Sequence, residues 1–342
     1  MKKLRVLVLM HRQFLPPASI AGLSEAEIHS FKMEYDVLRA LEGLGHDVRP
    51  LPVEDELAPI RAAIDEFQPH IAFNLLRFFH DITIYDAHVV SYLELMKTPY
   101  TGSNPRGLLL ASDKALSKKI LSYHRVRVPA FHTFRRSVRI AVPKRMTFPV
   151  IVKTVAEHAS FGIAQASIVH DTDGLRERIG FVHDRLGTDA IAEQYIEGRE
   201  LTVGVIGNLH LKSFPIWELR FENLPPGAEP IATARMKSDL KYQAKVGVKT
   251  DAARDLSPLK VGEIERMAKR IYRALDLSGF ARIDLRMDGE GRVFVLEANP
   301  NPDLCHGEDF ADSAAAAGLG YEALIQKIVS LGRGYRPAWK VD

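Results

Sequence analysis

Only one cysteine and two tryptophans occur among the 342 residues, and no apolar run is long enough to cross a bilayer. A single cysteine excludes a disulfide framework, and the short apolar runs exclude a transmembrane helix. The first ten residues are better explained as a buried strand than as a signal peptide, because Arg5 interrupts the apolar run and no small-residue cleavage site follows. We therefore expect a cytoplasmic protein without a membrane partner.

An excess of charge of one sign is also missing. The chain has 46 basic and 43 acidic side chains and a net charge of +3, a balance that argues against nucleic acid or a membrane surface as the main partner. A hydrophobic content of 46% over this length suffices for a large core and predicts two or three structural units.

Residues 4–103 show the pattern of a parallel sheet with crossover helices. Strands alternate with amphipathic helices over 4–10, 24–44, 47–51, 54–67 and 71–75. Ser24 and Glu27 have the spacing of a helix capping box. The segment after the first strand, 11–17, has no glycine fingerprint, which argues against a dinucleotide site. A substrate could still bind beyond the carboxyl ends of these strands.

Two lysines occur where a cleft could use them. Lys153 ends the apolar strand 148–153, and burying its charge without an anionic partner would be costly, so it should face a cleft. The small polar loop 154–162 that follows could direct backbone N–H groups at phosphates, or it is an ordinary hairpin loop. Lys114 begins the helix 112–121, whose lysines by themselves indicate no more than a solvated basic face.

Residues 190–203 predict a strand, a turn and a second strand, which could link two lobes. Such a strand can offer a purine an apolar slot and backbone hydrogen bonds, while Glu200 suits ribose hydroxyls; a purely structural linker is the alternative. The basic stretch 235–245 reads either as a gate for anions or as a solvated loop. The helix that starts at Pro258 has an apolar stripe that belongs to the core.

Residues 279–302 read as a hairpin with hard oxygen ligands. Its two runs of alternating apolar residues flank a glycine-bearing turn at 288–291. Side chains of a strand alternate between faces, so the second strand should place Phe294 and Leu296 opposite Glu297 and Asn299. If the loop holds an even number of residues, one polar face collects four side chains: Arg282, Asp284, Glu297 and Asn299. An odd loop would break this arrangement.

Taken in order, these segments resemble the ATP-grasp superfamily, and within it the D-alanine–D-alanine ligase branch of carboxylate-amine ligases. The resemblance covers about residues 100–331 and is most specific at 282–284 and 296–299. It implies an α/β protein, α+β in the ATP-grasp part, with an N-terminal Rossmann-like parallel sheet followed by two ATP-grasp lobes and the nucleotide between them. The corresponding domains are residues 1–103, 104–192 and 193–342.

The resemblance also implies roles for individual residues. Two magnesium ions, with Mn²⁺ as a substitute, would be held against the phosphates of ATP by Asp284, Glu297 and Asn299. Arg282 would contact the transferred phosphoryl group, and the lysine beneath the mobile lid would be Lys237, with Lys241 and Arg235 as rivals. Phosphates would be bound by Lys114, Lys153 and the loop residue Ser160. Adenine would meet Glu193, Tyr195 and Ile196, and the ribose would meet Glu200.

The implied activity is an ATP-dependent carboxylate-amine ligase that forms an amide or peptide bond through an acyl phosphate. Its substrates would be a small carboxylate and an amine, and related ligases are commonly homodimers. D-alanine is not implied, because segments 11–16 and 302–309 depart from the family pattern. Two alternatives stay open: an ATP-grasp phosphotransferase, and a non-catalytic nucleotide-binding regulator. Cys305 is expected to be a bystander, and His306 is an alternative substrate contact.

Overall fold

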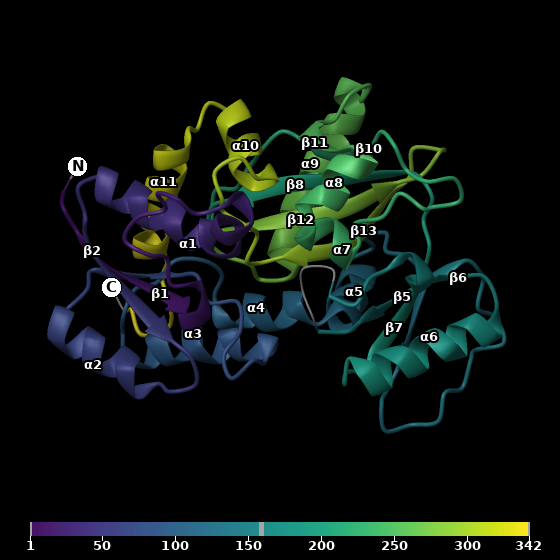
Figure 1. Cartoon of the computed structure of the whole chain (residues 1–342), viewed down its shortest axis with the longest axis horizontal. Helices are drawn as coiled ribbons and strands as arrows, with labels where there is room; N and C mark the ends of the chain where they lie inside the picture. The colour runs from purple at the N-terminus through teal and green to yellow at the C-terminus, as the bar shows by residue number, and fades with distance from the viewer. Residues whose placement is uncertain (1, 157–160, 341–342) are drawn as a thin grey trace.

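The computed structural model describes residues 2–156 and 161–340, and its strands form three sheets (Figure 1). The N-terminal sheet is parallel, in the order β2-β1-β3, and consists of β1 (Arg5–His11), β2 (Asp47–Val53) and β3 (Ile71–Asn74). Its helices are α1 (Glu25–Gly43), α2 (Ala58–Phe67) and α3 (Asp86–Leu95), with short 3-10 turns η1 (Arg12–Phe14) and η2 (Thr83–Tyr85). The Rossmann-like α/β prediction for this part is confirmed.

The helix boundaries follow from capping. Ser24 accepts a hydrogen bond from the backbone N–H of Glu27, whose carboxylate accepts one from the N–H of Ser24, so the predicted capping box is confirmed. The second helix begins at Ala58, four residues later than predicted from residue 54. Pro59 explains this start, because proline fits the first turn of a helix and has no N–H to leave unpaired.

The central lobe is an antiparallel sheet in the order β4-β7-β5-β6, with α6 (Thr172–Arg185) packed on it. Its strands are β4 (Phe131–Phe134), β5 (Val150–Thr154), β6 (Ile168–Val169) and β7 (Ala190–Gln194). Strand β6 is short, because the residues before it, Gln165–Ser167, form the 3-10 turn η3. Two helices, α4 (Pro105–Ser112) and α5 (Lys114–Tyr123), connect this lobe to the N-terminal sheet.

The C-terminal lobe is a second antiparallel sheet, in the order β11-β10-β8-β12-β13, with β9 (Lys212–Ser213) on β8. Its strands are β8 (Arg199–Ile206), β10 (Trp217–Phe221), β11 (Val248–Ala252), β12 (Phe280–Met287) and β13 (Val293–Asn299). Its back face packs on α9 (Pro258–Ala274), whose predicted apolar stripe is buried. The basic stretch is helical and forms α7 (Ala234–Ser238) and α8 (Leu240–Val246).

The last two helices, α10 (Asp309–Ala316) and α11 (Tyr321–Gly334), return to the start of the chain. α11 packs against α1 and β3, and Figure 1 shows the yellow C-terminal helix beside the purple N-terminal one. Leu324 and Ile328 of α11 share one core with Val6 and Val8 of β1. The domain boundaries at 103 and 192 stay a prediction. In the described part of the chain, none of the helices combines the length and the apolar character needed to cross a membrane.

Candidate active site

The β12–β13 hairpin presents its polar side chains through a β-bulge. Met287 pairs with Val293, so the loop consists of residues 288–292, an odd number. The even loop on which the predicted convergence depended is therefore not present. The register then shifts between Asp284 and Leu285, because the partner of Leu285 is Val295 but the partner of Asp284 is Glu297. The extra residue in β13 restores the convergence that the odd loop would have broken.

Beyond the bulge, the predicted quartet lies on one face. Asp284 pairs directly with Glu297, and Arg282 pairs with Asn299. Directly paired residues share a face, whereas Ile283 and Leu285 point to the other face and are fully buried. Phe294 pairs with Arg286 and thus shares the polar face, so the prediction that Phe294 lies opposite Glu297 is wrong. The bulge explains this error, because it changes the parity within β13.

Arg282 joins two carboxylates. Its Nε and Nη2 donate to the two oxygens of Asp284 at 2.7 and 2.9 Å, and its Nη1 lies 3.2 Å from an oxygen of Asp309. Burial alone would lower the pKa of Arg282, but the two carboxylates outweigh it and raise that pKa well above its usual value. Asp309, in the first turn of α10, was not among the predicted site residues. An acidic residue in the first turn of a helix is common because it interacts favourably with the helix dipole, so its position alone does not indicate a role in the site.

The same face has the oxygen donors that a divalent cation needs. Glu297 lies 3.4 Å from the ammonium of Lys114, and the side-chain carbonyl of Asn299 accepts a hydrogen bond from the N–H of Asn301. Two carboxylates on directly paired residues repel one another unless cations neutralise them. Two carboxylates and an amide in this arrangement fit Mg²⁺, which prefers oxygen ligands and keeps part of its shell for phosphate oxygens. The described residues hold no cluster of three or more His, Cys, Asp or Glu side chains arranged as a metal cage.

Three further charges meet beside this face, where the central lobe and α5 approach the hairpin. Glu193, which is fully buried, lies 3.0 Å from the ammonium of Lys153 and 3.3 Å from that of Lys118. Burial alone would raise the pKa of Glu193, but the two lysines outweigh it and lower the pKa. Lys118 also donates to the carbonyl of Leu296 in β13, so it ties the central lobe to the hairpin. Lys153 has the anionic partner that its place at a strand end demanded, and that partner is another predicted site residue.

Lys118 itself was missed. It was counted as part of a solvated basic face, yet only 1% of its side chain is exposed. Lys114 lies one helical turn earlier on α5 and contacts Glu297, so the two lysines form one row directed at the hairpin. Their i, i+4 spacing was the available signal in the sequence.

A cavity of about 520 Å³ lies between the turn of the β12–β13 hairpin and residues 194–198, which join β7 to β8 and are called the strand link below. It is lined by Phe294, by the turn residues Asp288, Gly289, Glu290 and Arg292, and by Gln194, Tyr195, Ile196, Glu197 and Gly198. This volume lies in the range of small-molecule sites. The predicted adenine contacts Tyr195 and Ile196 therefore line a cavity, while Glu193 points away into the lysine pair.

The residues that flank the loop 154–162 and the basic stretch 235–245 contact one another. The N–H of Ala234, at the start of α7, donates to the carbonyl of Ile163 at 2.9 Å. Lys237 lies on this helix and is partly buried. Ser160 of the phosphate loop lies outside the described residues.

Comparison with known proteins identifies the family. A family model described as "D-ala D-ala ligase C-terminus" matches residues 114–330. The D-alanine–D-alanine ligase of Desulforudis audaxviator is 32% identical over 92% of this chain and 97% of its own length. The chain belongs to the D-alanine–D-alanine ligase family. An uncharacterised protein of Sinorhizobium fredii, y4sG, is also 32% identical, over 71% of this chain and 69% of its own.

A solved structure of a D-alanine–D-alanine ligase from Bacillus anthracis, complexed with ATP, has the same fold. It superposes with a TM-score of 0.75 at 22% identity and covers 96% of this chain and 97% of that one. The predicted ATP-grasp, D-alanine–D-alanine ligase-like fold and family are thereby confirmed.

The part of this family member that departs from the expected pattern surrounds the carboxyl ends of β1 and β3. An aromatic group of His11, Phe14 and Phe78 lies there, and the guanidinium of Arg77 stacks on Phe14 at 4.1 Å from the ring centre. In the second departing segment, 302–309, Cys305 is buried. Burial raises the pKa of its thiol, as expected for a residue without a role in the reaction. The backbone of His306 is bound to Lys32 and Asp36 of α1.

Proposed function

We propose that this chain is an ATP-dependent carboxylate-amine ligase that forms an amide or peptide bond through an acyl phosphate. The observation that supports this most is the polar face of the hairpin, where Arg282, Asp284, Glu297 and Asn299 converge beside the lysines of α5. Phosphoryl transfer to a carboxylate requires positioned phosphates and neutralised charge rather than a protein nucleophile, and this face offers both.

In this proposal each group of residues has one task. Adenine lies against the backbone of Glu193 and against Tyr195 and Ile196, while the carboxylate of Glu193 stays between Lys118 and Lys153. Glu200 receives the ribose. Lys114, Lys153 and Ser160 hold the phosphates, with Lys237 above them. Asp284, Glu297 and Asn299 would hold two Mg²⁺ ions, or Mn²⁺ in their place, which when bound neutralise the phosphate oxygens and align them for transfer. Arg282 is fixed by Asp284 and Asp309 and neutralises the transferred phosphoryl group.

The reaction then has two transfers. A carboxylate oxygen of the acid attacks the γ-phosphorus, the bond to the departing ADP oxygen breaks, and an acyl phosphate forms. The nitrogen of the amine attacks the acyl carbon, loses a proton, and phosphate departs. Water would hydrolyse the intermediate, so the contact between Ala234 and Ile163 matters, because it brings the two closing segments together over the cleft.

The substrates in this proposal are a small carboxylic acid and an amine. D-alanine is the first compound to test in both roles, because several relatives have the name D-alanine–D-alanine ligase. Other small acids belong in the same test, because the group of Phe14, Arg77 and Phe78 lies where the family pattern changes, and Arg77 is paired there with the buried Glu34 at 2.7 Å. We further propose a cytoplasmic homodimer that acts without nucleic acid or membrane.

The test is a screen of amino acids and small carboxylates for amine-dependent release of phosphate from ATP, with the products identified by mass spectrometry. Asp284→Asn should lower the rate by the ~10²–10³ typical of losing one preorganised electrostatic group. Asp251→Asn, in β11 of the same sheet, is the matched control and should leave the rate unchanged. Full activity of Asp284→Asn would contradict the metal site, and a stable phosphorylated product without need of an amine would favour a phosphotransferase.

A further inference from the structure

Arg286 lies on β12 two residues after Asp284, on the same face of the sheet, with 3% of its side chain exposed. The proposed reaction gives it no task. A buried guanidinium is costly unless its donors are paired, so its partners indicate what it does.

The guanidinium of Arg286 connects β12, which carries it, to three other segments of the chain. Its Nη1 donates to the hydroxyl of Tyr195 at 3.1 Å and to the carbonyl of Ile196 at 2.8 Å. Its Nη2 donates to the carboxylate of Glu200 at 3.1 Å and to the carbonyl of Pro230. The guanidinium also lies over the Tyr195 ring, 5.1 Å from its centre. Arg286 thus contacts the strand link, the proposed ribose carboxylate and the segment before α7.

The segment 229–231 in turn binds to the central lobe. The carboxylate of Glu229 accepts a hydrogen bond from the hydroxyl of Tyr195 at 2.9 Å. Gln165 pairs with the backbone of Glu229 through two hydrogen bonds of 2.9 and 2.8 Å. Ile231 packs in one cluster with Ile151 and Ile168 of the central sheet. Through Pro230, Arg286 therefore connects the C-terminal sheet to a strap that crosses to the other lobe.

The geometry requires arginine rather than any cation. A guanidinium has donors fixed in a plane and can serve several acceptors at defined angles, whereas a lysine ammonium is a single mobile point charge. The contact to Arg286 uses Oε2 of Glu200, and a carboxylate has a second oxygen for further hydrogen bonds. Glu200 is accordingly held in one orientation, with 18% of its side chain exposed.

We propose that Arg286 is a positioning residue of the nucleotide site, which orients Glu200 toward the ribose hydroxyls while it fixes the strand link and the strap. This inference rests on the proposed function, because it places the adenosine of ATP along residues 194–200. It adds a role for a side chain whose polar contacts are to Tyr195, Ile196, Glu200 and Pro230.

The test is calorimetric titration with Mg²⁺ and three nucleotides: ATP, 2′-deoxyATP and 3′-deoxyATP. The wild type should bind ATP roughly tenfold more tightly than at least one deoxy analogue, which is the effect of one hydrogen bond to a charged group. Arg286→Lys should bind ATP more weakly and lose most of this preference. In a Glu200→Gln background, Arg286→Lys should lower the preference no further, since both act through the same carboxylate.

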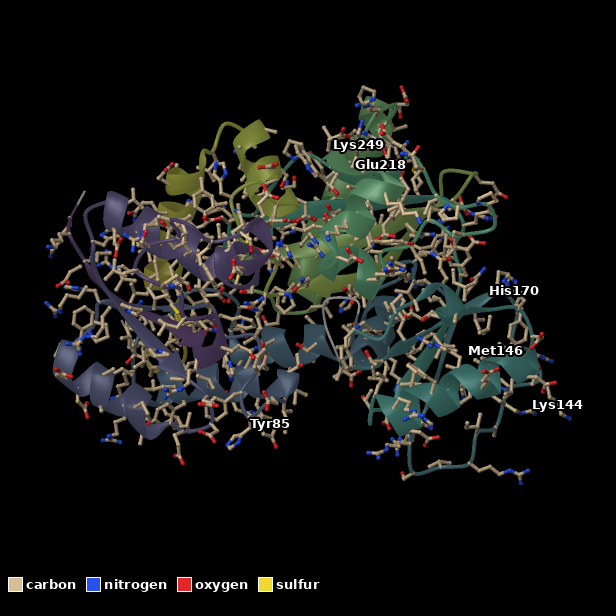
Figure 2. The ribbon with its side chains drawn as sticks, in the orientation of Figure 1. Tyr85, Lys144, Met146, His170, Glu218 and Lys249 are labelled. Atoms are coloured by element: carbon tan, nitrogen blue, oxygen red, sulfur yellow. The ribbon has the colours of Figure 1, made fainter. Side chains whose placement is uncertain are left out.

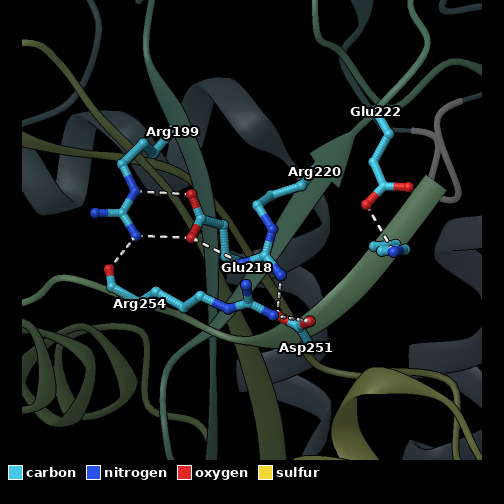
Figure 3. A network of polar contacts seen from close by, with 7 residues as sticks. Arg199, Glu218, Arg220, Glu222, Asp251 and Arg254 are labelled. Atoms are coloured by element: carbon cyan, nitrogen blue, oxygen red, sulfur yellow. Dashed lines mark hydrogen bonds and ion pairs between the residues drawn. The ribbon is translucent and has the colours of Figure 1, made fainter. Parts of the chain in front are cut away.

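Arg199 provides the matched control. It precedes Glu200 on β8, and its two bonds of 2.7 Å to Glu218 lie in a separate network with Arg220, Asp251 and Arg254 (Figure 3). Glu218 lies in the C-terminal lobe, well away from Lys144 and His170 of the central lobe (Figure 2). Arg199→Lys breaks another arginine–carboxylate pair, on the opposite face of the sheet and with 29% of the arginine side chain exposed, so it should lower the melting temperature without changing the ribose preference.

The outcomes separate the two proposals. If wild type binds ATP and Arg286→Lys keeps the ribose preference, the positioning role is wrong and the proposed function stands. An equal loss of affinity for all three nucleotides would also overturn it, because that is what general destabilisation predicts. If the wild type binds ATP without any preference for the ribose hydroxyls, Glu200 has no such role and the inference falls. Absence of ATP binding by the folded wild type would overturn both.

Discussion

At the scale of single residues, an unusual group lies where the N-terminal domain meets the hairpin. Asp86, at the start of α3, is 1% exposed, and its Oδ2 accepts a hydrogen bond from the side-chain amide of Asn301 at 2.8 Å. Within the described residues its Oδ1 has no hydrogen-bond partner. Burial raises the pKa of Asp86 from its ordinary 3.8 to about 7, although the bond to Asn301 opposes the rise. Folding therefore favours the protonated form of this carboxyl.

The raised pKa of Asp86 predicts that the free energy of unfolding depends on pH. Between pH 4 and 7 the folded state holds a proton on Asp86 that the unfolded state has released, so the stability contribution falls as pH rises through this window and is constant above it. Asp86→Asn removes the titration and keeps an acceptor for Asn301. Its stability relative to wild type should increase by roughly 1.4 kcal/mol per pH unit within the window. Urea unfolding of both proteins at pH 5, 6, 7 and 8 measures it, and a difference that does not change with pH would contradict the assignment.

Single residues also mark how far the sequence could predict the site. Asp284, Glu297 and Asn299 lie within one hairpin, so local alternation and the resemblance were enough to group them. Lys118 and Glu193 are 75 positions apart, and Arg282 meets Asp309 from a different element. Their burial follows from tertiary contacts that no local pattern encodes. For the same reason the sequence does not reveal that the carboxylate of Glu193 lies between two lysines, and its contact with adenine stays a prediction.

At the scale of elements, the turn between β7 and β8 is constrained by its glycine. Gly198 has a φ of +138°, a conformation that essentially only glycine adopts. A Cβ added there would lie 2.1 Å from the carbonyl oxygen of Met287, at the end of β12. The turn that lines the cavity is therefore pressed against the hairpin that carries the proposed metal ligands, and little space separates the two elements.

Gly198→Ala should therefore destabilise the protein by clearly more than the ~1–2 kcal/mol of a left-handed conformation alone. Gly227→Ala is the control, because Gly227 has a φ of +77° but no atom within 4 Å of the added Cβ. Thermal unfolding of the two variants separates close contact from backbone strain. Equal losses would show that the approach to Met287 costs nothing.

Helices and strands were predicted well where local sequence signals define them, and poorly where their geometry depends on pairing with another strand. The capping box set the start of α1, a continuous apolar run located β1, and alternating apolar residues located β12 and β13. The bulge in β13 could not be predicted, because an extra residue is defined only against a partner strand. The stretch 235–245 looked like a loop by its charge, yet Thr233 and Asp239 each cap a short helix.

At the scale of the whole molecule, the two ends of the chain build one core. α11 packs on α1 and β3, and Phe310 of α10 continues the same core to Phe214 and Phe280 in the C-terminal lobe. The amphipathic pattern of residues 321–331 does not indicate this contact, because a single sequence does not reveal which distant sheet an amphipathic helix covers. The N-terminal sheet thus depends on residues more than 300 positions away.

This connection predicts where the protein opens when α11 is weakened. Ile328 is 1% exposed, so Ile328→Ala should cost about 2–5 kcal/mol. Ile271→Ala in α9, which is fully buried behind the C-terminal sheet, should cost a similar amount. Amide hydrogen exchange distinguishes the two, because stability varies locally and each helix covers a different sheet. Exchange should accelerate mainly in β1 and β3 for Ile328→Ala, and mainly in β8 and β12 for Ile271→Ala. The same exchange pattern in both variants would mean that the sheets open as one cooperative unit, and the N-terminal sheet would then have no special dependence on the last helix.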